Sequence, residues 1–473
     1  MRRSPISKHL CYRDRRAETR KWHNVSVESH VKRKKPRFLP RAHSECCGDS
    51  APAKSGAHKL SQRAELTFKQ NRQHGRHGWL RLTPAYSVRL VDQLLEQFAP
   101  HADVVFDPFS GTGTTALCAA YRGKTGIATD INPFLVWLAN AKARSYEAAA
   151  IESFQHAAQL AVQTAADAGA ALAECPPLSN IERWWRPAAL AFLLRLKAAI
   201  DAHEVGDATL LQVAFCRTMM KLSNAAFNHQ SMSFRSVDSA VAPTAATFAG
   251  EKDSFRMQFL SDVDHVAAAA LDNPSGSAQF IHSNARGGLA DAAPLAKWRN
   301  RVDLLVTSPP YPNRMSYIRE LRPYMYWLRF LSTGRQAGEL DWEAIGGTWG
   351  VATSRLAQWL PANEFVPAGM AGILKKIRGA HEKNGKLLAN YVHKYFEDMF
   401  EHLAGMLPLL RRGATVHYIV GNSIFYGHMV CAEEYLAQQL AAVGLCDVRI
   451  VPIRKRNSKK GLLEFHVTGA RQT

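Results

Sequence analysis

Two short segments of this chain combine residue types that could bind and activate a ligand. The first, DPFSGTGTT at residues 107–115, follows the apolar residues 104–106 and leads into a helical pattern at residues 114–121. A strand, a glycine turn and a helix in this order let backbone approach a ligand closely and point the helix N-terminal amides at an anion. We therefore expect a ligand-binding turn rather than an ordinary tight connection.

The second segment, TSPPY at residues 307–311, follows another apolar run at residues 304–306. Ligands bind at the carboxyl ends of strands in α/β proteins. The prolines fix the carbonyl groups of Ser308 and Pro309, and Tyr311 offers a flat ring face for a base. A rigid loop without a ligand is the alternative interpretation, but the two segments together suggest a methyl donor and an extruded nucleobase.

Asp130 supplies a polar group that a nucleoside needs. It ends a predicted strand at residues 126–130 and follows Gly113 at close to the spacing at which a carboxylate receives ribose hydroxyls. The tripeptide GKT at residues 123–125 imitates the end of a phosphate-binding loop, but Cys118 stands where that loop needs its first glycine. The sequence therefore favours a nucleoside site over hydrolysis of a nucleoside triphosphate.

This combination of motifs resembles the S-adenosylmethionine-dependent DNA amino-methyltransferases. The TSPPY form is similar to the variant most often linked to cytosine-N4 methylation, while Asp or Asn in place of Ser308 is the commoner adenine-N6 form. The resemblance implies that S-adenosylmethionine is bound by Thr83, Asp107, Pro108, Phe109, Gly111, Gly113, Thr114, Asp130, Ile131 and Asn284. It implies catalytic roles for Ser308, Pro309, Pro310 and Tyr311.

The resemblance assigns these residues different parts of the donor. Asp107, Gly111 and Gly113 would hold the methionine part and Asp130 the ribose, whereas Asn284 stands where the family often has Asp near the adenine. Residues 83–87 resemble the segment that precedes the glycine motif in the family. Residues 312–319, 421–423 and 454–460 also look like segments of SPPY-type modification enzymes. The glycine motif comes first here and second in many of those enzymes, so the order is permuted.

The chemistry explains why such residues suffice. An exocyclic amino nitrogen is a poor nucleophile because its lone pair is conjugated with the ring, whereas a sulfonium methyl is already activated. Hydrogen bonds to the Ser308 side chain and the Pro309 carbonyl would free that lone pair, while Tyr311 holds the base. Methylation at carbon 5 of cytosine would need a nucleophilic cysteine within a Pro-Cys dipeptide, and this sequence has none.

Strands and helices alternate along most of the chain. Predicted strands cover residues 104–106, 126–130, 279–282, 304–306, 414–420, 448–453 and 462–467. Helices are expected at residues 88–98, 114–121, 133–144 and 391–410, with a loop region at residues 334–390. The pattern predicts a doubly wound α/β fold, and with the resemblance a Rossmann-like seven-stranded methyltransferase sheet with a helical insertion and a C-terminal hairpin.

Four segments follow from these patterns. Residues 1–76 read as a basic, disordered tail, residues 77–145 as the first part of the methyltransferase domain with the S-adenosylmethionine site, and residues 276–473 as its second part with TSPPY. Residues 146–275 read as a helical insertion that could recognise the target. This insertion is favoured for target recognition over residues 334–390.

Much of the net charge of +20 lies in the tail, where 20 Lys and Arg face 6 Asp and Glu. Such a segment is attracted to phosphates, or it is a solvated tail or an over-long start to the reading frame. The basic run at residues 454–460 invites the same two interpretations, phosphate contact or a solvated hairpin tip.

The remaining composition limits the setting of the protein. Eight cysteines lack paired spacing, no N-terminal signal segment is recognisable, and no long uncharged apolar stretch occurs, so we expect a cytoplasmic protein with no membrane partner. The scattered histidines predict no metal site.

DNA is the expected partner, with a separately encoded restriction endonuclease possible in a restriction-modification or related defence system. Adenine-N6 methylation, RNA methylation and a non-catalytic nucleic-acid-binding role remain as alternatives.

Overall fold

The computed structural model describes residues 60–82, 85–203, 208–226, 233–234, 245–287, 289–313, 316–362, 365–456 and 461–473. The chain divides into two units, Met1–Ala57 and His58–Thr473, and every described residue lies in the second. The predicted tail up to residue 59 and the predicted donor residue Thr83 lie outside the described residues.

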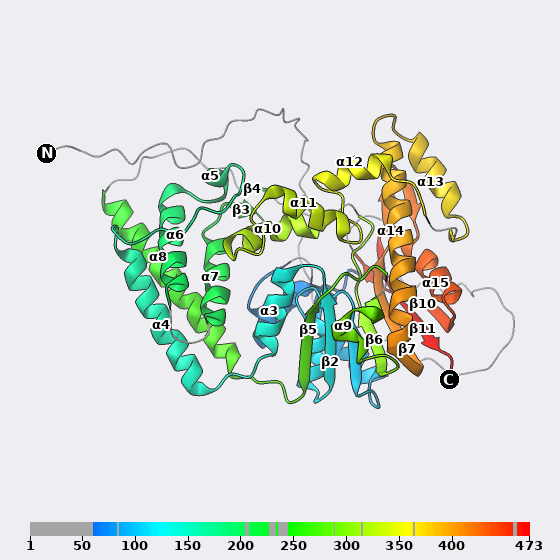
Figure 1. Cartoon of the computed structure of the whole chain (residues 1–473), viewed down its shortest axis with the longest axis horizontal. Coiled ribbons are helices and arrows are strands. Elements are labelled where there is room, and N and C mark those ends of the chain that lie inside the picture. The colour runs from blue at the N-terminus through cyan, green and yellow to red at the C-terminus, as the bar shows by residue number, and fades with distance from the viewer. Residues whose placement is uncertain are drawn as a thin grey trace. The chain divides into compact units, whose positions relative to one another are not determined.

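A seven-stranded sheet organises the second unit (Figure 1). Its strand order is β10-β11-β7-β6-β1-β2-β5. The strands β5, β2, β1, β6 and β7 are parallel, and β11 is antiparallel to both β7 and β10. The predicted doubly wound sheet and its C-terminal hairpin are therefore confirmed. The strands are β1 (Val104–Asp107), β2 (Thr125–Asp130), β5 (Ser277–His282), β6 (Val302–Thr307), β7 (Leu410–Gly421), β10 (Leu445–Lys455) and β11 (Leu463–Arg471).

The strand order reverses between β1 and β6. From β1 the chain continues outward to β2 and β5, and from β6 it continues the other way to β7. Val105 is in register with Leu304 and Phe106 with Leu305. A crevice at the carboxyl ends of strands at such a reversal is where doubly wound sheets bind ligands. The topology thus brings residues that follow β1 and β6 to one edge.

Each face of β1 packs against different helices. Val105 belongs to an apolar cluster with α1 (Val88–Phe98), and the next residue, Phe106, belongs to one with α14 (Gly385–Met406) and α15 (Ala432–Ala442). This alternation follows from the two-residue period of a strand. The predicted helix bounds at α1 and at α2 (Thr114–Tyr121) are confirmed, and the predicted helix at residues 133–144 is α3 (Pro133–Ala143).

The helices of residues 146–275 stand to the left of the sheet in Figure 1. They are α4 (Ala148–Ala166), α5 (Ile181–Trp184), α6 (Pro187–Asp201), α7 (Thr209–Lys221) and α8 (Ala245–Ala270), with a short pair of strands β3 (Ala225–Ala226) and β4 (Ser233–Phe234). These helices leave the sheet after α3 and return to it at β5.

Arg76 joins the two points at which the chain leaves and re-enters the sheet. Its side chain is fully buried. Its guanidinium donates to the carbonyl oxygen of Lys142 at 2.8 Å and to that of Ala269 at 3.3 Å, and also to those of Arg144 and Ala270. These carbonyls close α3 and α8, and carbonyls at helix C-termini lack intrahelical partners.

The sequence placed Arg76 in the tail, and this boundary is wrong. Three short 3₁₀ helices, Ala64–Leu66, Phe68–Gln73 and Gly75–Gly78, precede α1, and Leu66 and Asn71 are buried. The packed part of the chain therefore begins before residue 76. Composition did not reveal this because isolated apolar residues in a basic segment carry no period.

The predicted loop region at residues 334–390 is also wrong, since it holds three helices and the start of α14. They are α11 (Gly334–Glu343), α12 (Val351–Gln358) and α13 (Met370–Gly379), and they follow α10 (Tyr317–Trp327). Gly350 and Gly369, with φ of 63° and 82°, are the N-cap residues of α12 and α13. In the sequence these glycines favour a loop, but in the structure they separate successive helices.

Two smaller features complete the carboxyl edge. Beyond β7, the strands β8 (Ser423–Phe425) and β9 (His428–Val430) form a hairpin. The predicted helix at residues 391–410 begins earlier, at Gly385, and ends in a 3₁₀ turn, Leu407–Leu409. Within the described ranges, no helix is long and apolar enough to cross a membrane.

Candidate active site

The glycine turn between β1 and α2 is held by backbone geometry that glycine permits. Gly111 and Gly113 have φ of 52° and 85°, in the left-handed region. The amide of Gly113 donates to the Ser110 carbonyl at 2.8 Å. A Cβ at Gly113 would lie 2.9 Å from Cβ of Ala139 and 3.0 Å from the ring of Phe280. The turn therefore needs glycine both for its conformation and for its contact with β5 and α3.

Asp130, at the end of β2, braces this turn with both carboxylate oxygens. Oδ2 accepts from the amide of Gly111 and Oδ1 from the amide of Asn132, each at 2.8 Å. A carboxylate offers about four acceptor sites, so each oxygen can accept from one more group. Burial raises the pKa of Asp130 to about 7, although its backbone hydrogen bonds oppose the shift.

Asp107, at the end of β1, is fully buried. Its Oδ1 accepts from the Phe109 amide at 3.0 Å and from the Thr307 hydroxyl at 2.5 Å. Its Oδ2 is buried and has no hydrogen-bond partner among the described residues. Burial raises the pKa of Asp107 to about 6, and the hydrogen bond from Thr307 works against this.

Two more polar atoms around the turn, Oγ of Ser110 and Nδ2 of Asn132, are buried and lack a hydrogen-bond partner within the described part of the chain. A buried polar atom without a partner costs about 1–3 kcal/mol. The site thus offers acceptors and a donor that a bound molecule could satisfy, and an ammonium group and ribose hydroxyls fit an unpaired carboxylate oxygen and Asp130.

The other predicted donor residues lie at the same edge of the sheet. Among them, Asn284 stands where the family often has Asp, and its side chain makes hydrogen bonds within the protein. Asn284 follows β5, and its side chain holds its own loop, because Oδ1 accepts from the Arg286 amide at 3.0 Å and Nδ2 donates to the Glu343 carbonyl at 3.3 Å. The carbonyl of Ile131 lies 2.8 Å from Nε2 of His282. Asn284 therefore links the β5 loop to α11.

The TSPPY motif presents acceptors at the end of β6. Oγ of Ser308 donates to the Ile419 carbonyl at 3.1 Å. A hydroxyl has one proton, so Ser308 can only accept from a further group. The carbonyl of Pro310 accepts from the Tyr395 hydroxyl at 2.7 Å, whereas no described residue donates to that of Pro309. Ser308 and Pro309 therefore supply two acceptors suited to an amino group.

Tyr311 is held by charged groups from the C-terminal hairpin. Its hydroxyl donates to Oε1 of Glu464 at 2.8 Å, and the guanidinium of Arg456 lies 4.7 Å from its ring centroid. Burial raises the pKa of Tyr311 well above its ordinary value, so the phenol stays protonated. Arg454 in turn binds Glu464 through two nitrogens, at 2.7 and 3.0 Å.

The antiparallel strand explains why these residues meet. The start of β11 lies at the same edge as the ends of β7 and β10, since Glu464 is in register with Gly421 and with Arg454. Arg456 also donates to the Asn422 carbonyl at 2.7 Å, and a Cβ at Gly421 would lie 2.6 Å from its guanidinium. The two C-terminal segments noted in the sequence thus reach Tyr311. Glu464 was missed because a single acid in an apolar strand gives no local signal.

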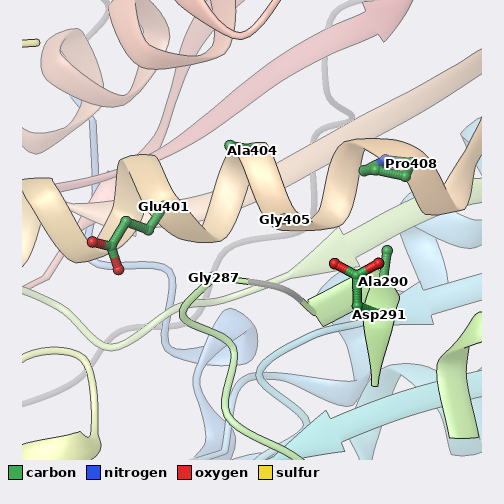
Figure 2. A pocket seen from close by; sticks show the side chains of 7 residues that line it. All are labelled: Gly287, Ala290, Asp291, Glu401, Ala404, Gly405 and Pro408. Atoms are coloured by element: carbon green, nitrogen blue, oxygen red, sulfur yellow. The ribbon is translucent and has the colours of Figure 1, made fainter. Parts of the chain in front are cut away.

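The two motifs adjoin directly through the hydrogen bond from Thr307 to Asp107, although 200 residues separate them in sequence. A cavity lies away from these motifs, between the loop after β5 and α14 (Figure 2). None of the predicted site residues lines it. Its walls are Gly287, Ala290, Asp291, Glu401, Ala404, Gly405 and Pro408. A search of the described residues finds no group of three His, Cys, Asp or Glu that could hold a metal ion.

The doubly wound seven-stranded sheet, with a glycine turn at its reversal point, is the fold that the resemblance to the methyltransferases predicted. Residues 11–141 match the family model of DNA methylases that act at N6 or N4. The resemblance to that family is confirmed over these residues, and the methyl donor of that family is S-adenosylmethionine.

Two individual proteins extend the comparison. The Type II methyltransferase M.BsoBI of Geobacillus stearothermophilus is 36% identical over 69 residues, which is 14% of this chain and 14% of that protein. The chain therefore spans a small part of the length of this curated relative. The solved structure of the rRNA methyltransferase aviRa from Streptomyces viridochromogenes aligns with 83% of this chain and 87% of its own at 11% identity, with a TM-score of 0.27.

Proposed function

We propose that this protein methylates DNA at the exocyclic amino group of an extruded base, cytosine N4 in the first place. The observation that carries the proposal is the hydrogen bond from Thr307 to Asp107, which joins the first residue of the TSPPY motif to the residue that ends β1 before the glycine turn. A donor methyl and an acceptor amino group held on either side of this contact would be close enough to react.

The roles proposed for the donor residues follow from the hydrogen bonds that their oxygen atoms can still accept. Asp107 accepts from the amino-acid ammonium through Oδ2, and Asp130 accepts from the ribose hydroxyls. Gly111 and Gly113 keep the turn open to the ligand, with Pro108, Phe109 and Thr114 forming its walls. S-adenosylmethionine, when bound, supplies a sulfonium-activated methyl group.

The target base is held by the other motif. Its amino hydrogens are accepted by Oγ of Ser308 and the carbonyl of Pro309, which favours a pyramidal nitrogen with an available lone pair. Tyr311 stacks on the base with the ring face that Arg456 leaves open. Pro310 keeps the loop rigid through its carbonyl contact with Tyr395.

Cytosine is proposed over adenine because Ser308 gives the motif its TSPPY form. A restriction-modification setting, with a separately encoded endonuclease, is supported by the printed name of the relative, a Type II methyltransferase. Adenine-N6 methylation is the second candidate, and RNA is a third acceptor to test.

The experiment is mass spectrometry of nucleosides from PCR-amplified genomic DNA treated with the protein and S-adenosylmethionine. N4-methylcytosine is the expected product. N6-methyladenine alone would replace the proposed base, 5-methylcytosine would contradict direct transfer to an amino group, and labelling of RNA but not DNA would replace the acceptor.

A further inference from the structure

The β8–β9 hairpin carries an aromatic residue in a conformation that costs free energy. Phe425 pairs with His428, so Tyr426 and Gly427 form a two-residue turn. Their φ values are 49° and 81°. Turns with two positive φ values favour Asn-Gly or Asp-Gly, and a bulky residue at positive φ is an outlier. Such strain concentrates at functional positions. The geometry of the turn does not favour Tyr426, so we infer that this side chain serves a purpose other than forming the turn.

The side chains at this tip point outward. Tyr426 and Ile424 are 39% and 41% exposed, whereas Phe425 between them is buried against the molecule. The ring of Tyr426 stacks on His381 with centroids 5.4 Å apart and an angle of 14° between the planes. The hairpin therefore fixes one aromatic ring at the surface and supports it from one side.

The surface beside Tyr426 is strongly basic. The segment between residues 375 and 386, which includes the end of α13 and the start of α14, has one acid, Glu382. None of its cations forms an ion pair with another residue in the described ranges. The exposed cations are Lys375, Lys376, Arg378, Lys383 and Lys386. Such a cluster attracts a polyanion.

The base of the β8–β9 hairpin is connected to the residues around Tyr311. The hairpin begins one residue after Asn422, whose carbonyl holds Arg456 over the ring of Tyr311. Asn422 also donates to the Gly461 carbonyl at 2.8 Å, which ties the base of the hairpin to the end of the Arg456 loop. Figure 1 shows α13 beside the upper end of α14, and α13 contacts β9 of the hairpin.

We propose that the β8–β9 hairpin and the cations of residues 375–386 bind the DNA duplex next to the extruded base. The lysines and Arg378 contact phosphates, and the ring of Tyr426 stacks against the bases that flank the vacated position. Aromatic rings bind nucleic acids by stacking on bases, and wedge residues of this kind stabilise distorted duplexes. The inference rests on the proposed DNA methylation and names the surface that would position its substrate.

Tyr426→Asn is a sharp test of the ring, because Asn suits the turn better than Tyr. We expect unchanged or higher thermal stability, unchanged S-adenosylmethionine binding, and about tenfold less methyl transfer to PCR-amplified genomic DNA. Tyr426→Phe should transfer methyl groups at the parent rate. Parent-level transfer by Tyr426→Asn would overturn the role of the ring.

The cations are tested by the double variant Lys375→Glu/Lys376→Glu, with Lys297→Glu/Arg412→Glu as its control. The control makes the same charge change at exposed residues near the amino ends of β6 and β7. For a fluorescent mixed-sequence duplex, the slope of log affinity against log salt should fall by about two in the first variant only. Equal effects of the two double variants would mean that only the net charge of the protein matters. That result would overturn the proposal that the cations of residues 375–386 contact the duplex.

Other outcomes separate this inference from the proposed function. A parent protein that labels no DNA refutes the proposed function. If the parent labels DNA and both Tyr426→Asn and Lys375→Glu/Lys376→Glu behave like the parent, the proposed DNA-binding surface is refuted and the proposed function is not. Loss of single-stranded RNA binding with unchanged duplex binding would show that the surface serves RNA instead.

Discussion

Asp130 has two tasks at the residue scale, since the same carboxylate braces the glycine turn and faces the proposed ribose. Its two backbone partners are 2.8 Å away, one on each oxygen. A ligand hydroxyl would therefore meet an acceptor that is already oriented. This arrangement links donor affinity to the charge of a single group.

The first prediction concerns this charge. The pKa of Asp130 is raised to about 7, so the carboxylate is mostly charged above pH 7 and mostly protonated below it. A protonated carboxyl has lost acceptor capacity, so the Kd for S-adenosylmethionine should rise as pH falls through 7. Calorimetry from pH 8 to pH 6 measures this. Asp130→Asn should bind more weakly and should keep only the rise in Kd near pH 6 that protonation of Asp107 causes. The prediction fails if the parent shows a flat profile.

At the same turn, Gly111→Val should weaken donor binding by about tenfold or more. A β-branched side chain disfavours the observed φ of 52° and places atoms where the backbone approaches the ligand. Parent-like binding by both Gly111→Val and Asp130→Ala would mean that the donor lies elsewhere.

The third prediction separates base binding from donor binding. Tyr311→Ala should lose methyl transfer and keep the donor Kd, because the ring is removed while the glycine turn is untouched. Ser308→Ala should slow transfer less, since the Pro309 carbonyl still accepts one amino hydrogen. Rapid-quench measurement of a single turnover, together with calorimetry, tests both. A weakened donor Kd in Tyr311→Ala would show that the two sites are not separate.

At the scale of elements, Arg76 fastens the helices of residues 146–275 to the sheet through the ends of α3 and α8. It also donates to Oδ1 of Asn273, whose Nδ2 returns a hydrogen bond to the Tyr146 carbonyl at 3.0 Å. One buried side chain therefore joins the end of α3, which precedes the helices of residues 146–275, to the end of α8, which is the last of them.

Arg76→Ala should lower the free energy of unfolding by about 3–5 kcal/mol, because several buried carbonyls lose their charged donor at once. Urea denaturation followed by circular dichroism measures the loss. The matched control is Arg63→Ala, which removes a partly exposed ion pair with Glu65 at 3.0 Å and should cost about 0–1 kcal/mol. Similar losses in both variants would contradict the assigned role of Arg76.

Elements were predicted well where a single period dominates the sequence. All seven sheet strands and α1 and α2 were found because apolar residues alternate or recur at helical spacing. The helices α11 to α13 were missed because each is short and has a glycine at its first residue or just before it, so that the composition resembles that of a loop. The contacts that hold these helices in place are non-local.

At the scale of the whole molecule, the basic N-terminal segment and the sheet belong to different units of the chain. Residues 1–57 contain 15 Lys and Arg against 5 Asp and Glu, and the unit His58–Thr473 includes every strand of the sheet. The charge of the first unit should therefore affect affinity for DNA more than the fold of the second.

Deletion of residues 1–57 should leave the thermal transition and the donor Kd unchanged and reduce non-specific duplex affinity, most of all at low salt. Anisotropy titrations across a salt series measure the effect. A truncated protein that fails to fold would show that the sheet depends on these residues. Unchanged affinity at every salt concentration would show that their charge does not act on DNA.

The sequence alone determined the strands, the glycine turn and the TSPPY motif, because each is written in consecutive residues. Only the tertiary structure decided that Thr307 donates to Asp107, that Glu464 and Arg456 contact Tyr311, and that Arg76 is buried. These contacts join residues that are distant in the chain. They depend on strand order and register, which hydrophobic periodicity restricts but does not specify.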